Sequence, residues 1–253
     1  MKGIGLTSVT FRKRSAAEIV ELASSCGLTA IEWGADVHAR PNDTDALSEI
    51  IRLTEKSCVK SCSYGSYYRA AARNEFGFDE VLVAAATLKV PCIRIWAGST
   101  GSADTKPEEF AALVGDLKTI TGKAAEREII IALEFHRGTY ADTAESVLKL
   151  ITECPGLRTY WQENPQIAFE ENLRELEALL PYIVNVHVFN LDADLNRYPL
   201  NGGADRWREY ARTIAKVGAS INMLLEFVKD DDALHFGEDA ETLKRIIGTR
   251  SEL

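Results

Sequence analysis

Short apolar runs alternate with amphipathic stretches along the whole chain. Each run is rich in β-branched or other apolar residues and is followed by a polar or glycine-rich segment, as is typical of buried strands. Amphipathic stretches such as residues 16–25 and 107–125 lie between the runs, and the second opens with Pro107 and two glutamates, which are helix-start signals. The eight runs span residues 3–7, 30–33, 59–64, 92–96, 129–135, 157–162, 183–189 and 221–227. This alternation predicts parallel strands joined by helical crossovers.

Eight such units in 253 residues predict an α/β fold of the (β/α)8 TIM barrel type, with residues 1–253 as a single domain. A doubly wound sheet usually has fewer strands and a glycine-rich phosphate-binding turn after the first one. Here the first run leads instead into Ser8, Val9, Thr10 and Phe11, so the sequence does not support dinucleotide or P-loop chemistry. In a barrel, the loops that follow the strands form the active face.

Four polar residues stand at the ends of successive apolar runs: Glu134, Gln162, His187 and Glu226. If those runs are neighbouring parallel strands, the four side chains meet at one mouth of the barrel. A carboxylate at the end of a buried run needs a partner, because an unpaired buried charge is costly. One interpretation is a structural ion pair with an Arg or Lys of the barrel. The other is a divalent metal site, for which an imidazole and two carboxylates suit Mn, Co, Zn or Mg.

Several segments together resemble a known family. They are GLTAIEW, VPCIRIWAG, ALEFHRGTYADTAESVLKLI and PLNGGADRW, in this order along the chain. The pattern is similar to the sugar-phosphate isomerase/epimerase families of the xylose-isomerase-like barrel superfamily, and it covers nearly the whole sequence. The resemblance implies a metal held by Glu, Asp, His and Glu from strands five to eight, with the two glutamates also exchanging protons with the substrate.

Carried over by position, the implied ligands are Glu134, Gln162, His187 and Glu226. The second departs from the family pattern, because Gln offers a carbonyl oxygen but no charge. We therefore expect weaker metal binding and a more electrophilic ion. The alignment leaves Asn164 as a rival ligand on strand six.

The implied chemistry is proton transfer next to a carbonyl. A dication that contacts adjacent carbonyl and hydroxyl oxygens of a sugar acidifies the C–H between them and stabilises the enediolate. Glu134 and Glu226 are the expected acid and base. Return of the proton to the opposite face is epimerisation, and return to the neighbouring carbon is isomerisation.

Other polar and aromatic residues are candidates for binding substrate. Trp33 and Trp96 end strands two and four, where flat rings can cover a sugar, although core packing is the alternative. Glu32 is a further rim candidate, with an ion pair to Arg94 as its structural interpretation.

Tyr64 belongs to a stretch rich in hydroxyls and rings, residues 63–69, which we interpret as a loop after strand three that could form a lid or pocket wall. His136 follows the strand-five glutamate by two and is expected on the same side. Arg197 lies in the loop after strand seven, where it could bind a hydroxyl or phosphate or could be a solvated charge.

Composition restricts the partners and the compartment. A net charge of -9 and a pI near 5.1 argue against nucleic acid and anionic membranes and favour a small carbohydrate substrate. Five scattered cysteines without CxxC spacing indicate a reducing compartment. No secretory leader or membrane-spanning run is recognisable, so we expect a cytoplasmic protein, and assembly into a homo-oligomer stays open.

Three functions remain compatible with the sequence. The first is a metal-dependent isomerase or epimerase of a small sugar or sugar phosphate, with a related dehydratase as a close variant. The second is an abasic-site endonuclease, which shares the barrel but uses several zinc ions and many histidines, whereas this chain has four histidines. The third is a sugar-binding barrel that has lost tight metal binding through Gln162.

Overall fold

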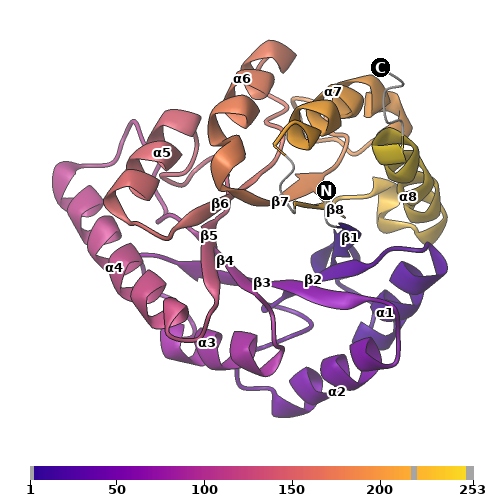
Figure 1. Ribbon diagram of the computed structural model, residues 1–253, viewed down its shortest axis with the longest axis horizontal. Coiled ribbons are helices and arrows are strands. Elements are labelled where there is room, and N and C mark those ends of the chain that lie inside the picture. Colours follow the sequence, from indigo (N-terminus) through magenta and orange to yellow (C-terminus); the bar gives the residue numbers. More distant parts are fainter. Residues whose placement is uncertain (1–2, 218–220, 249–253) are drawn as a thin grey trace.

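In the part of the chain that the structure describes, eight parallel strands form a closed barrel in the order in which they occur in the sequence, and eight α-helices surround it (Figure 1). The computed structural model describes residues 3–217 and 221–248, so the ends of the predicted domain 1–253 lie outside the described residues. β1 closes the barrel by pairing with both β2 and β8. The predicted (β/α)8 fold is confirmed.

The strands are β1 Gly3–Thr7, β2 Ala30–Gly34, β3 Lys60–Arg69, β4 Cys92–Trp96, β5 Ile130–Leu133, β6 Arg158–Trp161, β7 Ile183–Val188 and β8 Asn222–Leu225. The helices are α1 Ala16–Ser25, α2 Thr44–Glu55, α3 Phe78–Thr87, α4 Pro107–Ala125, α5 Ala144–Glu153, α6 Phe169–Leu179, α7 Ala204–Ala215 and α8 Ala233–Gly248. Short 3-10 helices lie at Ser8–Phe11, Leu180–Tyr182, Leu200–Gly203 and Lys229–Asp231.

Local sequence signals set the ends of the two helices that the pattern predicted. α1 starts at a capping box, in which the Ser15 hydroxyl accepts from the Glu18 N–H and the Glu18 carboxylate accepts from the Ser15 N–H. α4 starts with Pro107 at its first position. Both helices have the predicted bounds.

Most strand boundaries agree with the prediction to within two residues, and one differs by more. Residues 63–69, which we interpreted as a loop, belong to the ten-residue strand β3. Gly65 pairs with Gly34 of β2, and after an irregular stretch in the pairing with β4 Arg69 pairs with Trp96. Serine and tyrosine fit a pleated strand as well as a loop, so their polarity did not mark the strand end.

Side chains along each strand point alternately to the apolar core between barrel and helices and to the inside of the barrel. In β4, Ile93 and Ile95 belong to the large apolar core between barrel and helices, whereas Arg94 is a buried charge between them in sequence. In β7, Val186 and Val188 belong to that core, and His187 is the buried polar residue between them. Successive strand residues point to opposite faces, so the inside of the barrel is polar. This polar interior leads to the mouth where the strands end.

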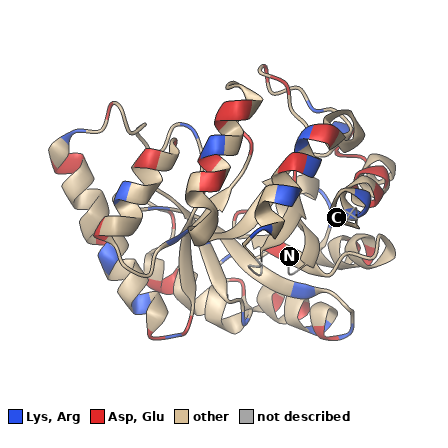
Figure 2. Cartoon of the chain, turned by 45° about the horizontal axis from the view of Figure 1, so that its top comes forward, with Lys and Arg blue, Asp and Glu red and all other residues tan. Residues whose placement is uncertain are grey.

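The charges on the outside carry both signs. Figure 2 shows acidic and basic side chains interspersed over the surrounding helices, without a broad basic face in this view. In the described part of the chain, no helix combines the length and the apolar character that crossing a membrane requires.

Candidate active site

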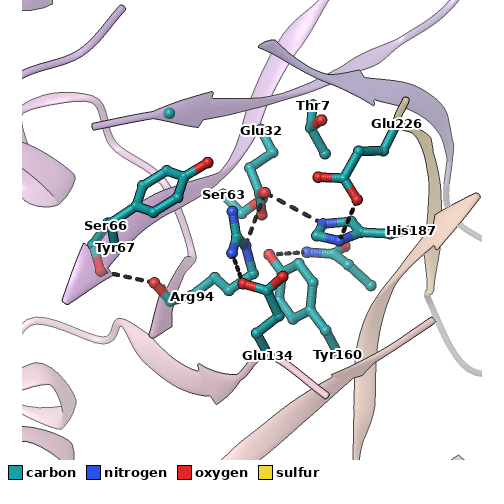
Figure 3. A network of polar contacts seen from close by, with 12 residues as sticks. Thr7, Glu32, Ser63, Ser66, Tyr67, Arg94, Glu134, Tyr160, His187 and Glu226 are labelled. Atoms are coloured by element: carbon teal, nitrogen blue, oxygen red, sulfur yellow. Dashed lines mark hydrogen bonds and ion pairs between the residues drawn. The ribbon is translucent and has the colours of Figure 1, made fainter. Parts of the chain in front are cut away.

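Three of the four predicted metal ligands lie together at the C-terminal mouth of the barrel. His187, on β7, has its Nδ1 3.2 Å from Gln162 Oε1 and 3.4 Å from Glu226 Oε2. Gln162 directly follows β6 and Glu226 directly follows β8, so the three come from neighbouring strands. Figure 3 shows the Glu226 carboxylate directed toward the His187 ring.

The fourth residue, Glu134, has other partners. It follows β5, and its Oε2 accepts hydrogen bonds from Arg94 Nη1 and Trp96 Nε1. Arg94 is itself 2% exposed, so this is a buried ion pair (Figure 3). For Glu134, the structure therefore agrees with the first interpretation of the buried carboxylates, an ion pair with an arginine of the barrel.

Glu32 connects the two halves of the site. Arg94 Nε donates to Glu32 Oε1 at 3.0 Å, and Ser63 Oγ donates to Glu32 Oε2 at 3.1 Å. The same Glu32 Oε1 lies 3.3 Å from His187 Nε2. A continuous series of charged contacts thus runs from Glu226 through His187, Glu32 and Arg94 to Glu134 (Figure 3).

Burial and neighbouring charges shift the pKa values in this series. Burial alone would raise the pKa of Glu32, but Arg94 and His187 outweigh it and hold that pKa at about 2. Burial raises the pKa of Glu226, and His187 only partly offsets the shift. Burial would lower the pKa of His187, yet Glu226 and Glu32 raise it overall. With a neutral imidazole, three carboxylates face one guanidinium, which leaves two negative charges unbalanced.

The donor atoms fit a divalent cation. Glu226 Oε2 is buried, has no hydrogen-bond partner and lies beside His187 Nδ1, whereas His187 Nε2 faces Glu32 on the other side of the ring. Among residues 3–217 and 221–248, no three His, Cys, Asp or Glu side chains come close enough to hold a metal ion. The amide oxygen of Gln162 supplies a third donor beside His187 and Glu226, and this mixture of nitrogen and oxygen ligands suits Mn, Co or Zn.

Asn164, the rival ligand on strand six, lines the smaller of two cavities at this mouth, but no hydrogen bond among the described residues joins it to His187. Its side-chain oxygen accepts the Gln166 N–H at 3.0 Å. The neighbouring Glu163 is also engaged, in a two-pronged ion pair with Arg206 and a hydrogen bond from Tyr210. These contacts tie the β6–α6 loop to α7 and leave Gln162 as the residue that reaches His187.

Two adjoining cavities open at this mouth. The larger has a volume of about 700 Å³, and Arg94, Glu134 and Glu226 are among its lining residues. The smaller, of about 260 Å³, reaches Gln162. Both are bordered by His136, Arg197 and Phe227. Together they have the size of a small-molecule site.

Three of the five predicted substrate residues border these cavities. Trp96 lines the larger one and stacks on His136, with ring centroids 5.3 Å apart. His136 and Arg197 line both cavities. Arg197 also pairs with Asp231 and lies over the Phe227 ring, so it is not a freely solvated charge.

Trp33 and Tyr64 lie in the apolar core, away from the cavities, which corrects their expected position. Trp33 Nε1 donates to Ser61 Oγ, and the Tyr64 hydroxyl donates to the Ala39 carbonyl. The reason is strand alternation: Glu32 points into the barrel, so the next residue, Trp33, points outward to the helices. Trp33 therefore packs in the core, which was the alternative to a role in binding substrate.

The sequence analysis underestimated Arg94 and included Tyr67 only as part of the stretch 63–69, as a possible pocket wall. Arg94 was considered only as a partner of Glu32, yet it binds Glu134 as well. A charged residue in the middle of the apolar run CIRIW was the available signal, because a buried arginine requires acidic partners. Tyr67 lines the larger cavity, and its ring lies 5.6 Å from the Arg94 guanidinium. Burial raises the pKa of Tyr67 to about 12.

Comparison with known proteins gives a family and several relatives. The model of a family described as "Xylose isomerase-like TIM barrel" matches residues 20–246. A curated 3-dehydroshikimate dehydratase from Bacillus anthracis is 24% identical over 207 residues, which cover 74% of this chain and 71% of that protein.

Solved structures share the fold. A probable 3-DHS dehydratase from Bacillus anthracis, involved in petrobactin synthesis, has a TM-score of 0.79 at 18% identity and covers 99% of this chain and 100% of its own. A protein named IOLI, with a binding zinc atom, has a TM-score of 0.75 at 15% identity and covers 100% of both chains. A D-allulose 3-epimerase from Methylomonas sp. has a TM-score of 0.72 at 13% identity, covering 99% of this chain and 98% of its own.

Proposed function

This chain belongs to the xylose isomerase-like TIM barrel family, and we propose that it is a metal-dependent enzyme that transfers a proton next to a carbonyl group of a small polyhydroxylated substrate. The observation that carries the proposal is the cavity of about 700 Å³ with Glu134 and Glu226 in its wall. The reaction is isomerisation or epimerisation when the proton returns to the substrate.

Gln162, His187 and Glu226 are the residues that would hold the ion, since their donor atoms converge and Glu226 Oε2 has no hydrogen-bond partner. When bound, a divalent ion polarises the substrate carbonyl and so acidifies the adjacent C–H. The zinc named for the IOLI protein supports this proposal by analogy of fold.

Glu134 is suited to exchange a proton with the substrate. Arg94 and Trp96 both donate to its Oε2, which fixes the carboxylate group. Its other oxygen, Oε1, accepts no hydrogen bond from the described residues and belongs to a side chain in the cavity wall. A base must reach the C–H proton directly, and this arrangement leaves one oxygen free to do so.

Glu226 is the second proton-transfer group that we propose. It follows β8, whereas Glu134 follows β5, so the two carboxylates approach the cavity from strands that are not neighbours. Removal of the proton by one and its return by the other inverts the carbon or moves the carbonyl. Trp96, His136 and Arg197 would position the substrate, because they border the same space.

Hydrogen exchange tests this proposal. Purified protein with added Mn²⁺ is incubated in D₂O with a panel of ketoses and their phosphates, and deuterium at the carbon next to the carbonyl is measured by NMR. We expect exchange that Glu134→Gln or Glu226→Gln lowers by about 100-fold, the usual range for one acid–base group. Wild-type exchange in both variants would refute the assignment of acid and base.

Dehydration is a second candidate, favoured by the 24% identical relative named as a dehydratase. It begins with the same proton removal, after which the hydroxyl on the next carbon leaves as water. Incubation with 3-dehydroshikimate distinguishes the two, since loss of water produces an aromatic ring with strong ultraviolet absorption. Aromatic product without exchange into ketoses would favour dehydration, and the reverse would favour isomerisation or epimerisation.

A further inference from the structure

We propose that Arg94 keeps Glu134 outside the metal coordination, so that Gln162, His187 and Glu226 hold the ion while Glu134 acts only on the substrate. This inference rests on the proposed metal-dependent function. It departs from the four-ligand set that the family resemblance implies, and it makes Arg94 a positioning residue.

The contacts of Glu134 are the first argument. Its Oε2 already accepts from two donors, the Arg94 guanidinium and the Trp96 indole N–H. Within the described part of the chain, no hydrogen bond or ion pair joins Glu134 to His187, whereas Gln162 and Glu226 both lie within 3.4 Å of His187 Nδ1. Movement of Glu134 to an ion would leave a buried guanidinium with Glu32 as its only acidic partner, which is unfavourable.

The space around Arg94 is the second argument. Gly65 lies beside it, and a Cβ at that position would be 2.6 Å from Arg94 Nη2 and 3.2 Å from Glu32 Oε1. The guanidinium is therefore packed against a surface that only glycine leaves open. Trp96, the second donor to Glu134, is itself covered by Arg69, whose guanidinium carbon is 3.6 Å from the ring centroid. Arg94 thus has little room to move on the side of Gly65.

The charge balance is the third argument. Glu32 and Glu134 pair with Arg94, and Glu226 lies beside His187, so with a neutral imidazole the three carboxylates and one guanidinium leave two negative charges for one dication. An aspartate at position 162 would add a third negative charge, whereas Gln162 adds none. The neutral ligand and the arginine therefore both lower the negative charge of this buried site, and together they leave the two negative charges that one dication balances.

A substitution that preserves charge shows whether Glu134 binds the ion directly or only influences it through its negative charge. Mn²⁺ is titrated into each protein, and the free ion is followed by its EPR signal. Glu134→Asp keeps the charge but shortens the side chain by one methylene, and we expect its Mn²⁺ affinity to stay within about three-fold of wild type. Glu226→Asp is the matched control, and we expect it to weaken binding by about ten-fold or more, as for the loss of a direct ligand.

A double substitution gives a second, independent test. Glu134→Gln alone removes one negative charge from the site and should weaken Mn²⁺ binding, whereas Arg94→Gln alone removes one positive charge and should strengthen it. The double variant has the net charge of the wild type and should bind Mn²⁺ within about three-fold of it. Arg94→Lys, which keeps the charge, should also resemble wild type. Circular dichroism melts identify any variant that has not folded, and Glu134→Asp then decides alone.

The outcomes separate this inference from the proposed function. Wild-type protein that binds no Mn²⁺ would refute the metal site and this inference with it. Wild-type binding that Glu134→Asp and the double variant lose as completely as Glu226→Asp would refute only the inference, because Glu134 would then be a ligand.

Discussion

Gly65→Ala is expected to destabilise the protein through the buried ion pairs of the site. The new methyl group would lie 2.6 Å from Arg94 Nη2, whereas ordinary contacts begin near 3.4 Å, so about 0.8 Å of movement is required. Arg94 is 2% exposed and held by Glu32 and Glu134, so it cannot swing into solvent. The guanidinium must therefore shift against its partners.

The magnitude follows from two contributions. Overpacking of a buried site costs about 1–3 kcal/mol, and weakening of a buried ion pair adds to this. We expect a loss of about 2–3 kcal/mol in the free energy of unfolding. For a chain of this length, that loss lowers the midpoint of thermal unfolding by about 5–10 °C.

Urea and thermal unfolding measure the effect, with Gly115→Ala in α4 as the matched control. Gly115 is an exposed helical glycine, and no atom lies within 4 Å of the place that an alanine Cβ would take there, so alanine should stabilise by about 0.5–1 kcal/mol. If Gly65→Ala unfolds within about 0.5 kcal/mol of wild type, the interpretation of Gly65 as the space that accommodates Arg94 is wrong.

Two further predictions concern other parts of the molecule. Gln162→Asp adds a carboxylate beside His187 and should increase Mn²⁺ affinity by about ten-fold or more in the same EPR titration; unchanged affinity would mean that position 162 does not contact the ion. Asp239→Asn tests a buried carboxyl of α8 that accepts the Leu200 N–H, where burial raises the pKa to about 6. Because the folded pKa lies above the unfolded value, the carboxyl favours folding below about pH 4, and this contribution is lost as the pH rises through about 6. The variant should therefore match wild type at pH 4 and exceed it at pH 8 by about 1 kcal/mol. A difference in the free energy of unfolding that does not depend on pH, measured by urea unfolding, would contradict this.

The sequence predicted the barrel because its signals are local and repeated. Each buried strand is a short apolar run, and parallel topology then brings the ends of all strands to one mouth. That rule alone is sufficient to bring Gln162, His187 and Glu226 together. It is insufficient for Glu134, whose partner depends on which inward-facing residue of the adjacent strand lies nearest.

The errors in the predicted substrate wall have a single physical origin. Strand alternation fixes which face each side chain occupies, so Glu32 inside the barrel requires Trp33 outside it. Treating every polar or aromatic residue at a strand end as part of the mouth ignored this parity. The same parity places Trp96, two residues after Arg94, in the wall of the cavity.

The polar interior of the barrel also explains why the site has so little freedom. Arg94 and Glu32 lie below the mouth at 2% and 1% exposure, where neither charge is stable alone. Each must keep its partner. Glu32 contacts His187, one of the proposed ligands, and Arg94 pairs with Glu134, which lines the cavity. The requirement to pair buried charges therefore fixes the orientation of the groups that carry the chemistry. A substitution that disturbs these buried pairs, such as Gly65→Ala, should therefore loosen the site although it changes none of the proposed ligands.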